Sequence, residues 1–193
     1  MNKTRIEAFS DGVLAIIITI MVLEIKIPHS SNWDGLIHLI PIIISYLLSF
    51  IYIGIYWVNH HHLFHSISKV TSGILWSNLN LLFWLSLIPF STGWMGENHF
   101  EPNTIAVYAV SLLMPAIAYY ILQTAIMNCQ LSPEAFAEAH QKQNTKGKIS
   151  LVCYILAIPF AFIYSYLSGF LFILVAFMWI IPDKNIEKVF KDM

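Results

Sequence analysis

An arginine and an aspartate lie six residues apart at the start of the first long apolar run, in the segment Arg5-Ile6-Glu7-Ala8-Phe9-Ser10-Asp11-Gly12. Charged side chains at the edge of a membrane-embedded helix are costly in lipid, so they normally face protein or water and mark a functional element. Alternatively, Ser10 or Asp11 caps the helix, because a helix N-terminus favours a carboxylate. The residues alone leave both interpretations open.

A histidine-rich segment ends the second apolar run, Tyr56-Trp57-Val58-Asn59-His60-His61-His62-Leu63-Phe64-His65. His61 and His65 have the i, i+4 spacing of two zinc ligands on one helix face. A zinc site needs three or four well-placed ligands, however, and no acidic or cysteine partner is near in sequence. We therefore expect no metal site here.

An aliphatic stripe follows the first charged segment. Ile16, Ile20, Leu23 and Ile27 have the spacing i, i+4, i+7, i+11, which places them along one helix face, with Thr19 at the edge. Such a face can line a pore whose aliphatic rings form constrictions and whose hydroxyl meets a dehydrated ion. Equally, a span this apolar always contains some aliphatic stripe, so the pattern alone does not decide.

Several kinds of chemistry have no candidate residues. Apart from Asp11, no Asp, Glu, Lys or Arg lies deep in an apolar run, and no phosphate-binding loop or nucleophile motif is present. Carriers and proton pumps commonly use intramembrane carboxylates as relays. Cys129 and Cys153 lie far apart and outside any CxxC pattern, which predicts neither a disulfide scaffold nor a metal site. The sequence therefore favours passive conduction or a structural role over catalysis, with no catalytic residues, no cofactor and no nucleic-acid partner.

The elements that position these residues are membrane spans. The chain of 193 residues is 58% hydrophobic and only 11% charged, whereas soluble domains carry about 25% charged residues. This composition predicts a single-domain, all-α integral membrane protein over residues 1–193. At about 20 apolar residues per crossing, six spans are expected: 8–27, 36–58, 74–95, 104–127, 149–165 and 169–181. One long tilted helix over 149–181 is the alternative and would give five.

The distribution of basic residues favours six spans with both termini in the cytoplasm. Only Lys26 then lies on the outer side. Nine basic residues lie on the inner side: Lys3, Arg5, Lys69, Lys142, Lys146, Lys148, Lys184, Lys188 and Lys191. Five spans would give six against four, a weaker positive-inside bias.

Two polar stretches flank the last spans. Ser132-Pro133-Glu134 predicts the start of a short cytoplasmic helix within 128–148, and 183–193 reads as a short charged tail. The N-terminal run is long, and Glu7 and Asp11 interrupt its start, so cleavage as a signal peptide is not expected.

This topology brings the start of the first span and the end of the second to the same side of the membrane. The imidazoles, Asn59 and the Trp57 indole can then hydrogen-bond Ser10 and Asp11. Such a network would fix the angle of the first helix. Because histidine titrates near neutral pH, the network would also be pH-sensitive.

Three motifs together resemble a known family. They are Arg5-x-x-x-Phe9-Ser10-Asp11-Gly12 in the first span, Trp57-Val58-Asn59-His60-His61-His62-Leu63-Phe64 at the end of the second, and Asn78-x-x-Leu81 through Leu87-Ile88-Pro89-Phe90-Ser91-Thr92 in the third. They are similar to the signatures of the transmembrane protein 175 family, potassium channels of endosomes and lysosomes with shorter prokaryotic homologues. Six spans suit a single-repeat prokaryotic member.

The resemblance implies a homotetramer in the lipid bilayer, with the first helices lining a central pore. The residues it assigns to pore constriction and selectivity are Ile16, Thr19, Ile20 and Leu23. The residues it assigns to a helix-packing and gating network are Arg5, Phe9, Ser10, Asp11, Trp57, Asn59, and His60 or His61. His62 stands where some members carry arginine, which departs from the family pattern.

The sequence and the resemblance together predict a potassium-favouring cation channel of a prokaryotic inner membrane. It conducts passively, with potassium as the permeant ion. Selectivity is expected to be modest, because one ring of hydroxyls does not replace a hydration shell as stacked carbonyls do. The alternatives are a proton-conducting channel of the same architecture, a secondary transporter, and a histidine-ligated haem or metal enzyme.

Overall fold

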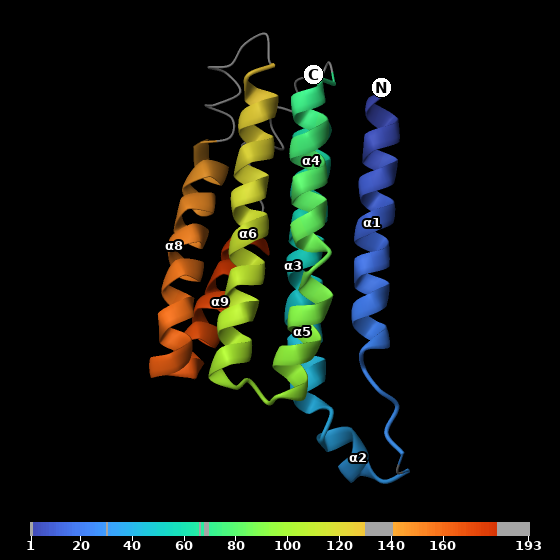
Figure 1. Ribbon diagram of the computed structural model, residues 1–193, viewed down its shortest axis with the longest axis vertical. Coiled ribbons are helices and arrows are strands. Elements are labelled where there is room, and N and C mark those ends of the chain that lie inside the picture. The colour runs from blue at the N-terminus through green and yellow to red at the C-terminus, as the bar shows by residue number, and fades with distance from the viewer. Residues whose placement is uncertain (1, 30, 66, 68–69, 130–140, 181–193) are drawn as a thin grey trace.

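The computed structural model describes residues 2–29, 31–65, 67, 70–129 and 141–180, and each regular element within these ranges is an α-helix. The helices are α1 (Lys3–Leu23), α2 (Trp33–Ile37), α3 (Ile40–His65), α4 (Ser72–Leu85), α5 (Ile88–Glu97), α6 (Pro102–Met127), α8 (Gln141–Ile163) and α9 (Ser165–Ile180). Figure 1 shows the long helices side by side, with α1 at one edge of the bundle, α8 at the other, and α2 beyond one end. The helix expected at Ser132-Pro133-Glu134 and the charged tail fall outside the described residues.

Most of the bundle is long and apolar enough to cross a membrane. Among the described residues, five stretches meet that requirement, Lys3–Leu23, Ile40–His65, Ser72–Glu97, Pro102–Met127 and Gln143–Ile163, and α9 is a shorter apolar helix of 16 residues. A helix pairs all its backbone groups internally, so apolar helices of this length are stable in hydrocarbon. The chain is an integral membrane protein.

The third apolar stretch is interrupted in its middle. α4 is capped by the Thr71 hydroxyl, which accepts from the Ile74 N–H, and it ends at Leu85. Ser86 and Leu87 separate it from α5. Pro89 explains the interruption, because its ring carries no N–H to bond the carbonyl four residues earlier and clashes with that turn.

The last two helices form an antiparallel hairpin joined at Tyr164. The Ser168 hydroxyl donates to the Ala157 carbonyl at 2.7 Å, near the turn. The Trp179 indole donates to the Ser150 hydroxyl at 2.9 Å, at the far end. The break therefore lies at the start of the expected 165–169 segment, and α8 begins earlier than the span expected from residue 149.

Buried polar contacts and close backbone approach hold α3, α5 and α6 together. The Ser49 hydroxyl lies 2.7 Å from that of Thr92 and 2.9 Å from that of Tyr108, all three buried. Where α5 meets α3, a Cβ on Gly96 would lie 2.7 Å from the backbone Cα of Ile42, so only glycine fits. α1 lies at the edge of the bundle and packs against α3, α4 and α5.

Candidate functional site

The charged start of α1 is not a helix cap. Asn2 is the N-cap, its side chain accepting from the Thr4 N–H at 3.4 Å. Ser10 and Asp11 therefore lie inside α1, where Ser10 is completely buried and Asp11 is exposed. Of the two interpretations that the sequence left open, capping by Ser10 or Asp11 is excluded.

Ser10 belongs to a buried hydrogen-bonded chain across three helices. The Asn78 Nδ2 of α4 donates to the Ser10 Oγ at 2.9 Å, and the Asn78 Oδ1 lies 2.8 Å from the His60 Nε2 of α3. Because the Asn78 oxygen can only accept, His60 carries a proton on Nε2. The imidazole stacks on the Phe64 ring, with centroids 4.3 Å apart. Each of the three polar side chains is at most 2% exposed, so the chain fixes α1 against α3 and α4.

A second set of contacts connects α1 to α3 at the more exposed edge. The Trp57 indole donates to the Asp11 Oδ1 at 3.0 Å, and the Lys3 ammonium donates to the His65 carbonyl at 3.0 Å. Trp57 and His60 are three residues apart on α3, so both face α1. The Asp11 carboxylate and the buried Ser10 hydroxyl thus contact different helices, through Trp57 of α3 and Asn78 of α4.

Asn59 faces away from α1. Its carboxamide donates to the Ile55 carbonyl of its own helix at 2.7 Å, and its Oδ1 accepts from the Gln143 Nε2 of α8 at 2.6 Å. The Tyr119 hydroxyl of α6 donates to the Asn59 backbone carbonyl at 3.1 Å. Asn59 therefore connects α3 to α6 and α8 rather than to Ser10 and Asp11.

The remaining residues expected in the network are at the surface of the subunit. Arg5, Phe9 and His61 are all exposed. The His61 ring centroid lies 5.9 Å from that of His62 and 6.3 Å from that of His65. Within the described part of the chain, no group of three His, Cys, Asp or Glu side chains can hold a metal ion.

The aliphatic stripe of α1 lies on its exposed side. Ile6, Ser10, Leu14, Ile17 and Met21 are buried against the bundle. Ile16, Ile20 and Leu23 are 60%, 43% and 74% exposed, respectively. The subunit therefore leaves an apolar helix face uncovered along most of α1.

Thr19 is exposed on the same helix, and its hydroxyl donates to the Ala15 carbonyl at 2.8 Å. Since the hydroxyl proton points back along the helix, the oxygen lone pairs remain available on the outside. Such an oxygen can accept a hydrogen bond or contact a cation, as ion pathways require.

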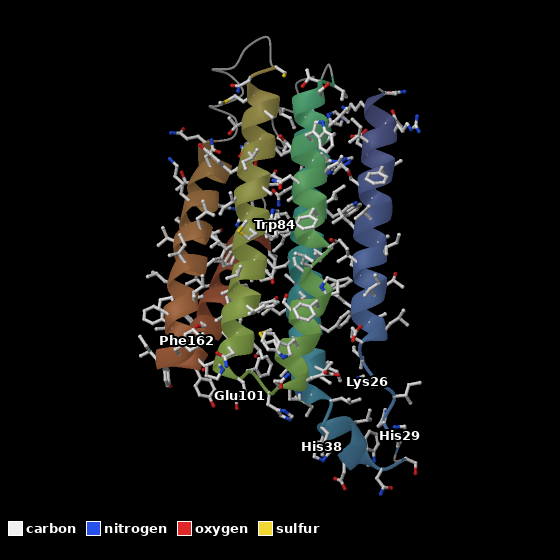
Figure 2. The ribbon with its side chains drawn as sticks, viewed as in Figure 1. Lys26, His29, His38, Trp84, Glu101 and Phe162 are labelled. Carbon is white, nitrogen blue, oxygen red and sulfur yellow. The ribbon has the colours of Figure 1, made fainter. Side chains whose placement is uncertain are left out.

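The opposite end of α1 is tied to α5 by an exposed ion pair. The Lys26 ammonium lies 2.6 Å from the Glu97 Oε1. The hydrogen bond from Lys26 to Glu97, and then the charge of that carboxylate, raise the pKa of Lys26 above its ordinary value. Figure 2 shows Lys26 at the end of the bundle opposite the N-terminus of α1. α1 is thus bonded to the rest of the subunit near both of its ends.

Comparisons with known proteins match this arrangement. The family model described as endosomal/lysosomal potassium channel TMEM175 matches residues 5–89, which contain most of α1 and the hydrogen-bonded chain. A potassium channel of Chryseobacterium sp. (strain P1-3) is 52% identical over 193 residues, which is the whole of both proteins. The chain belongs to the TMEM175 family. A potassium channel of Streptomyces collinus (strain DSM 40733 / Tue 365) is 37% identical over 131 residues, 63% of this chain and 64% of that protein.

The TMEM175 fold is shared as well as the sequence. The crystal structure of a lysosomal potassium-selective channel TMEM175 homolog from Chamaesiphon minutus superposes with a TM-score of 0.78 at 30% identity. It covers 92% of this chain and 95% of that one. The resemblance and the all-helical membrane fold expected from the sequence are confirmed. The bacterial relatives place this member in a prokaryotic cell membrane.

Sequence reasoning gave no role to Asn78, the central residue of the chain that joins α1 to the TMEM175 bundle. A signal was present, because an asparagine in an apolar span is costly unless its carboxamide is hydrogen-bonded. The partners could not be read in the same way, since they lie 68 and 18 residues away.

Proposed function

We propose that this TMEM175 protein is a homotetrameric, potassium-favouring cation channel whose pore is enclosed by four copies of α1. The observation that carries the proposal is the uncovered face of α1 in a chain closely related to potassium channels. One subunit, with α1 at its edge, cannot enclose a pore. Several copies that turn these faces toward a common axis can.

The alternative for an uncovered apolar face is contact with lipid, and Arg5 argues against it. By helical spacing, Arg5 lies on the same face as Ile16 and Leu23, near the N-terminal end. A charged side chain in contact with lipid is costly, whereas one at the mouth of an aqueous pathway remains solvated.

The face offers both a barrier and a coordinating oxygen. In the tetramer, Ile16 forms the narrowest ring, and Ile20 and Leu23 form further rings that can close the pathway by excluding water. The Thr19 oxygens, whose protons are donated within the helix, partly replace the hydration shell of the ion. Conduction is passive, and no cofactor takes part beyond the permeant potassium ion.

The hydrogen-bonded network sets which face of α1 meets the axis. The Ser10–Asn78–His60 chain and the Trp57–Asp11 contact prevent α1 from rotating about its own axis. A rotation would turn Ile16 and Leu23 away from the pore. Arg5 and Phe9 line the mouth, and His61 lies at its margin.

Ion flux through proteoliposomes tests the proposal. Vesicles loaded with potassium and diluted into sodium should show protein-dependent potassium efflux, and Ile16→Asn should increase it because a polar ring stays wetted. Ile155→Asn is the matched control, because Ile155 is 55% exposed on α8, far from α1. Equal flux in wild type and Ile16→Asn, or an equal increase in the control, would refute the pore assignment. A reversal potential that follows a pH gradient instead of the potassium gradient would favour the proton-conducting alternative.

A further inference from the structure

A cavity of about 130 Å³ lies away from α1, between α3, α6 and α8, with one wall from α9. Aromatic rings and aliphatic side chains form most of its surface. The lining aromatic residues are Tyr52, Tyr56, Tyr119, Tyr120, Tyr154 and Trp179. None of the residues assigned to the pore lines this cavity, so the ion pathway does not explain it.

Two carboxamides among the lining residues have unsatisfied atoms. The Gln123 Nε2 and the Gln143 Oε1 have no hydrogen-bond partner among the described residues. Their side chains are only 7% and 5% exposed. A buried polar atom without a partner destabilises a protein, and in a native structure it requires an explanation.

The two atoms are complementary, because one is a donor and the other an acceptor. A hydroxyl group accepts one hydrogen bond and donates another, so a single hydroxyl has the chemistry to satisfy both. A carboxylate cannot donate a hydrogen bond, and a quaternary ammonium can neither donate nor accept one. The polar requirement of the cavity is therefore that of an alcohol or a phenol.

The volume and the lining set the apolar part of the ligand. An engineered apolar cavity of about 150 Å³ stays dry and binds benzene, so this cavity has space for one aromatic ring. Tyrosine and tryptophan walls favour a ring over a chain, because aromatic pairs gain from edge-to-face packing. A single water molecule can also satisfy the two carboxamide atoms, but it would leave the aromatic surface that forms most of the lining without a packing partner.

We propose that this cavity is a binding site for a ring-sized amphiphile, an aromatic ring that carries one hydroxyl. The site is connected to the pore helix through α3. Gln143 donates to Asn59, and the next residue, His60, holds Asn78. A ligand that engages Gln143 thus acts on the segment of α3 that positions α1.

Phenol is the probe, and toluene is its isostere without the hydroxyl. Equilibrium dialysis of the full-length protein in detergent, with protein-free micelles as the blank, gives the bound fraction of each. We expect phenol to bind at least about fivefold more tightly than toluene, the gain of one satisfied hydrogen bond. Gln123→Met, which keeps the side-chain length and removes the donor, should reduce this preference, because only the Gln143 acceptor then remains for the hydroxyl.

Filling the cavity tests its location. Gly147 lines the cavity, and a Cβ there meets nothing within 4 Å, so Gly147→Leu occupies the space. Gly169→Leu on α9 is the matched control, because its Cβ is equally unobstructed and the residue does not line the cavity. Both remove a glycine from a helix, which favours folding. Loss of phenol binding in Gly147→Leu alone supports the site. No phenol binding by wild type, or equal binding by both variants, would overturn the proposal and leave a cavity filled by water or detergent.

Discussion

Replacing Asn78 with leucine removes the centre of the chain that joins α1 to α3 and α4. Leucine has a similar volume, so the change deletes hydrogen bonds and leaves little cavity. It leaves the Ser10 hydroxyl and the His60 Nε2–H buried without their partner, and each orphaned group costs about 1–3 kcal/mol. Polar contacts in membrane proteins are weaker, averaging about 0.6 kcal/mol, because the unfolded chain also finds partners, so the lower part of the range applies to each group. We therefore expect a loss of about 2–3 kcal/mol in the free energy of unfolding.

For a chain of this size, about 1 kcal/mol corresponds to about 2–4 °C in melting temperature, so Asn78→Leu should lower Tm by about 4–12 °C. Tryptophan fluorescence during thermal unfolding in detergent measures the change. Asn80→Leu, at a half-buried position two residues along the same helix, is the control and should cost far less. Adding Ser10→Ala to Asn78→Leu should cost less than the sum of the single changes, because it removes one orphaned group. A Tm drop for Asn78→Leu no larger than that of Asn80→Leu would refute the reasoning.

Two further predictions concern Thr19 and Lys26. Thr19→Val keeps the side-chain shape but replaces the cation-facing oxygens with methyl groups. It should lower the potassium-to-sodium permeability ratio, measured from reversal potentials, about two- to tenfold. An unchanged ratio would remove Thr19 from the ion pathway. The raised pKa of Lys26 means that its ion pair with Glu97 stabilises the fold below the ordinary pKa of 10.5 and is lost as pH rises through the higher folded value. The Tm difference between wild type and Lys26→Met should therefore be constant from pH 6 to about 9 and shrink only in stronger alkali. A difference that vanishes near neutral pH would contradict a stabilising ion pair between Lys26 and Glu97.

Hydropathy predicted the membrane class and the approximate helices, because the stability of a helix in the hydrocarbon core depends mainly on how apolar its residues are. It did not predict the helix ends. α1 begins at Lys3 rather than at residue 8, since the Asn2 cap allows polar residues to continue the helix, and α3 runs to His65 beyond the expected end at 58. The interruption between α4 and α5 could have been predicted from Pro89. The short α2 was not separated from the second span, which was expected from residue 36, because Leu36 and Ile37 are as apolar as the residues of α3.

For the candidate site, the sequence identified residue types better than partners. Trp57 and His60 have an i, i+3 spacing and Asn59 lies between them, so helical geometry alone could have placed Asn59 on a different side. Asn78 links Ser10 to His60 only because α1, α3 and α4 pack with particular orientations about their own axes. These orientations are set by packing between segments that are distant in the chain, which the sequence of any one segment does not reveal. Gln123 and Gln143 were likewise missed. Gln123 stands in an apolar run and gave a signal, whereas Gln143 lies in the polar segment 141–148 and gave none.

The buried chain of Ser10, Asn78 and His60 also restricts how this protein can change in evolution. Replacing any one of the three leaves another buried and unpaired, so a single substitution passes through a less stable protein. Threonine at position 10 keeps the acceptor oxygen but adds a methyl group to a site with 0% exposure, and glutamine at position 78 shifts its carboxamide outward by one methylene. The three positions should therefore diverge jointly among descendants or stay as they are, while the exposed residues of α8 and α9 change freely.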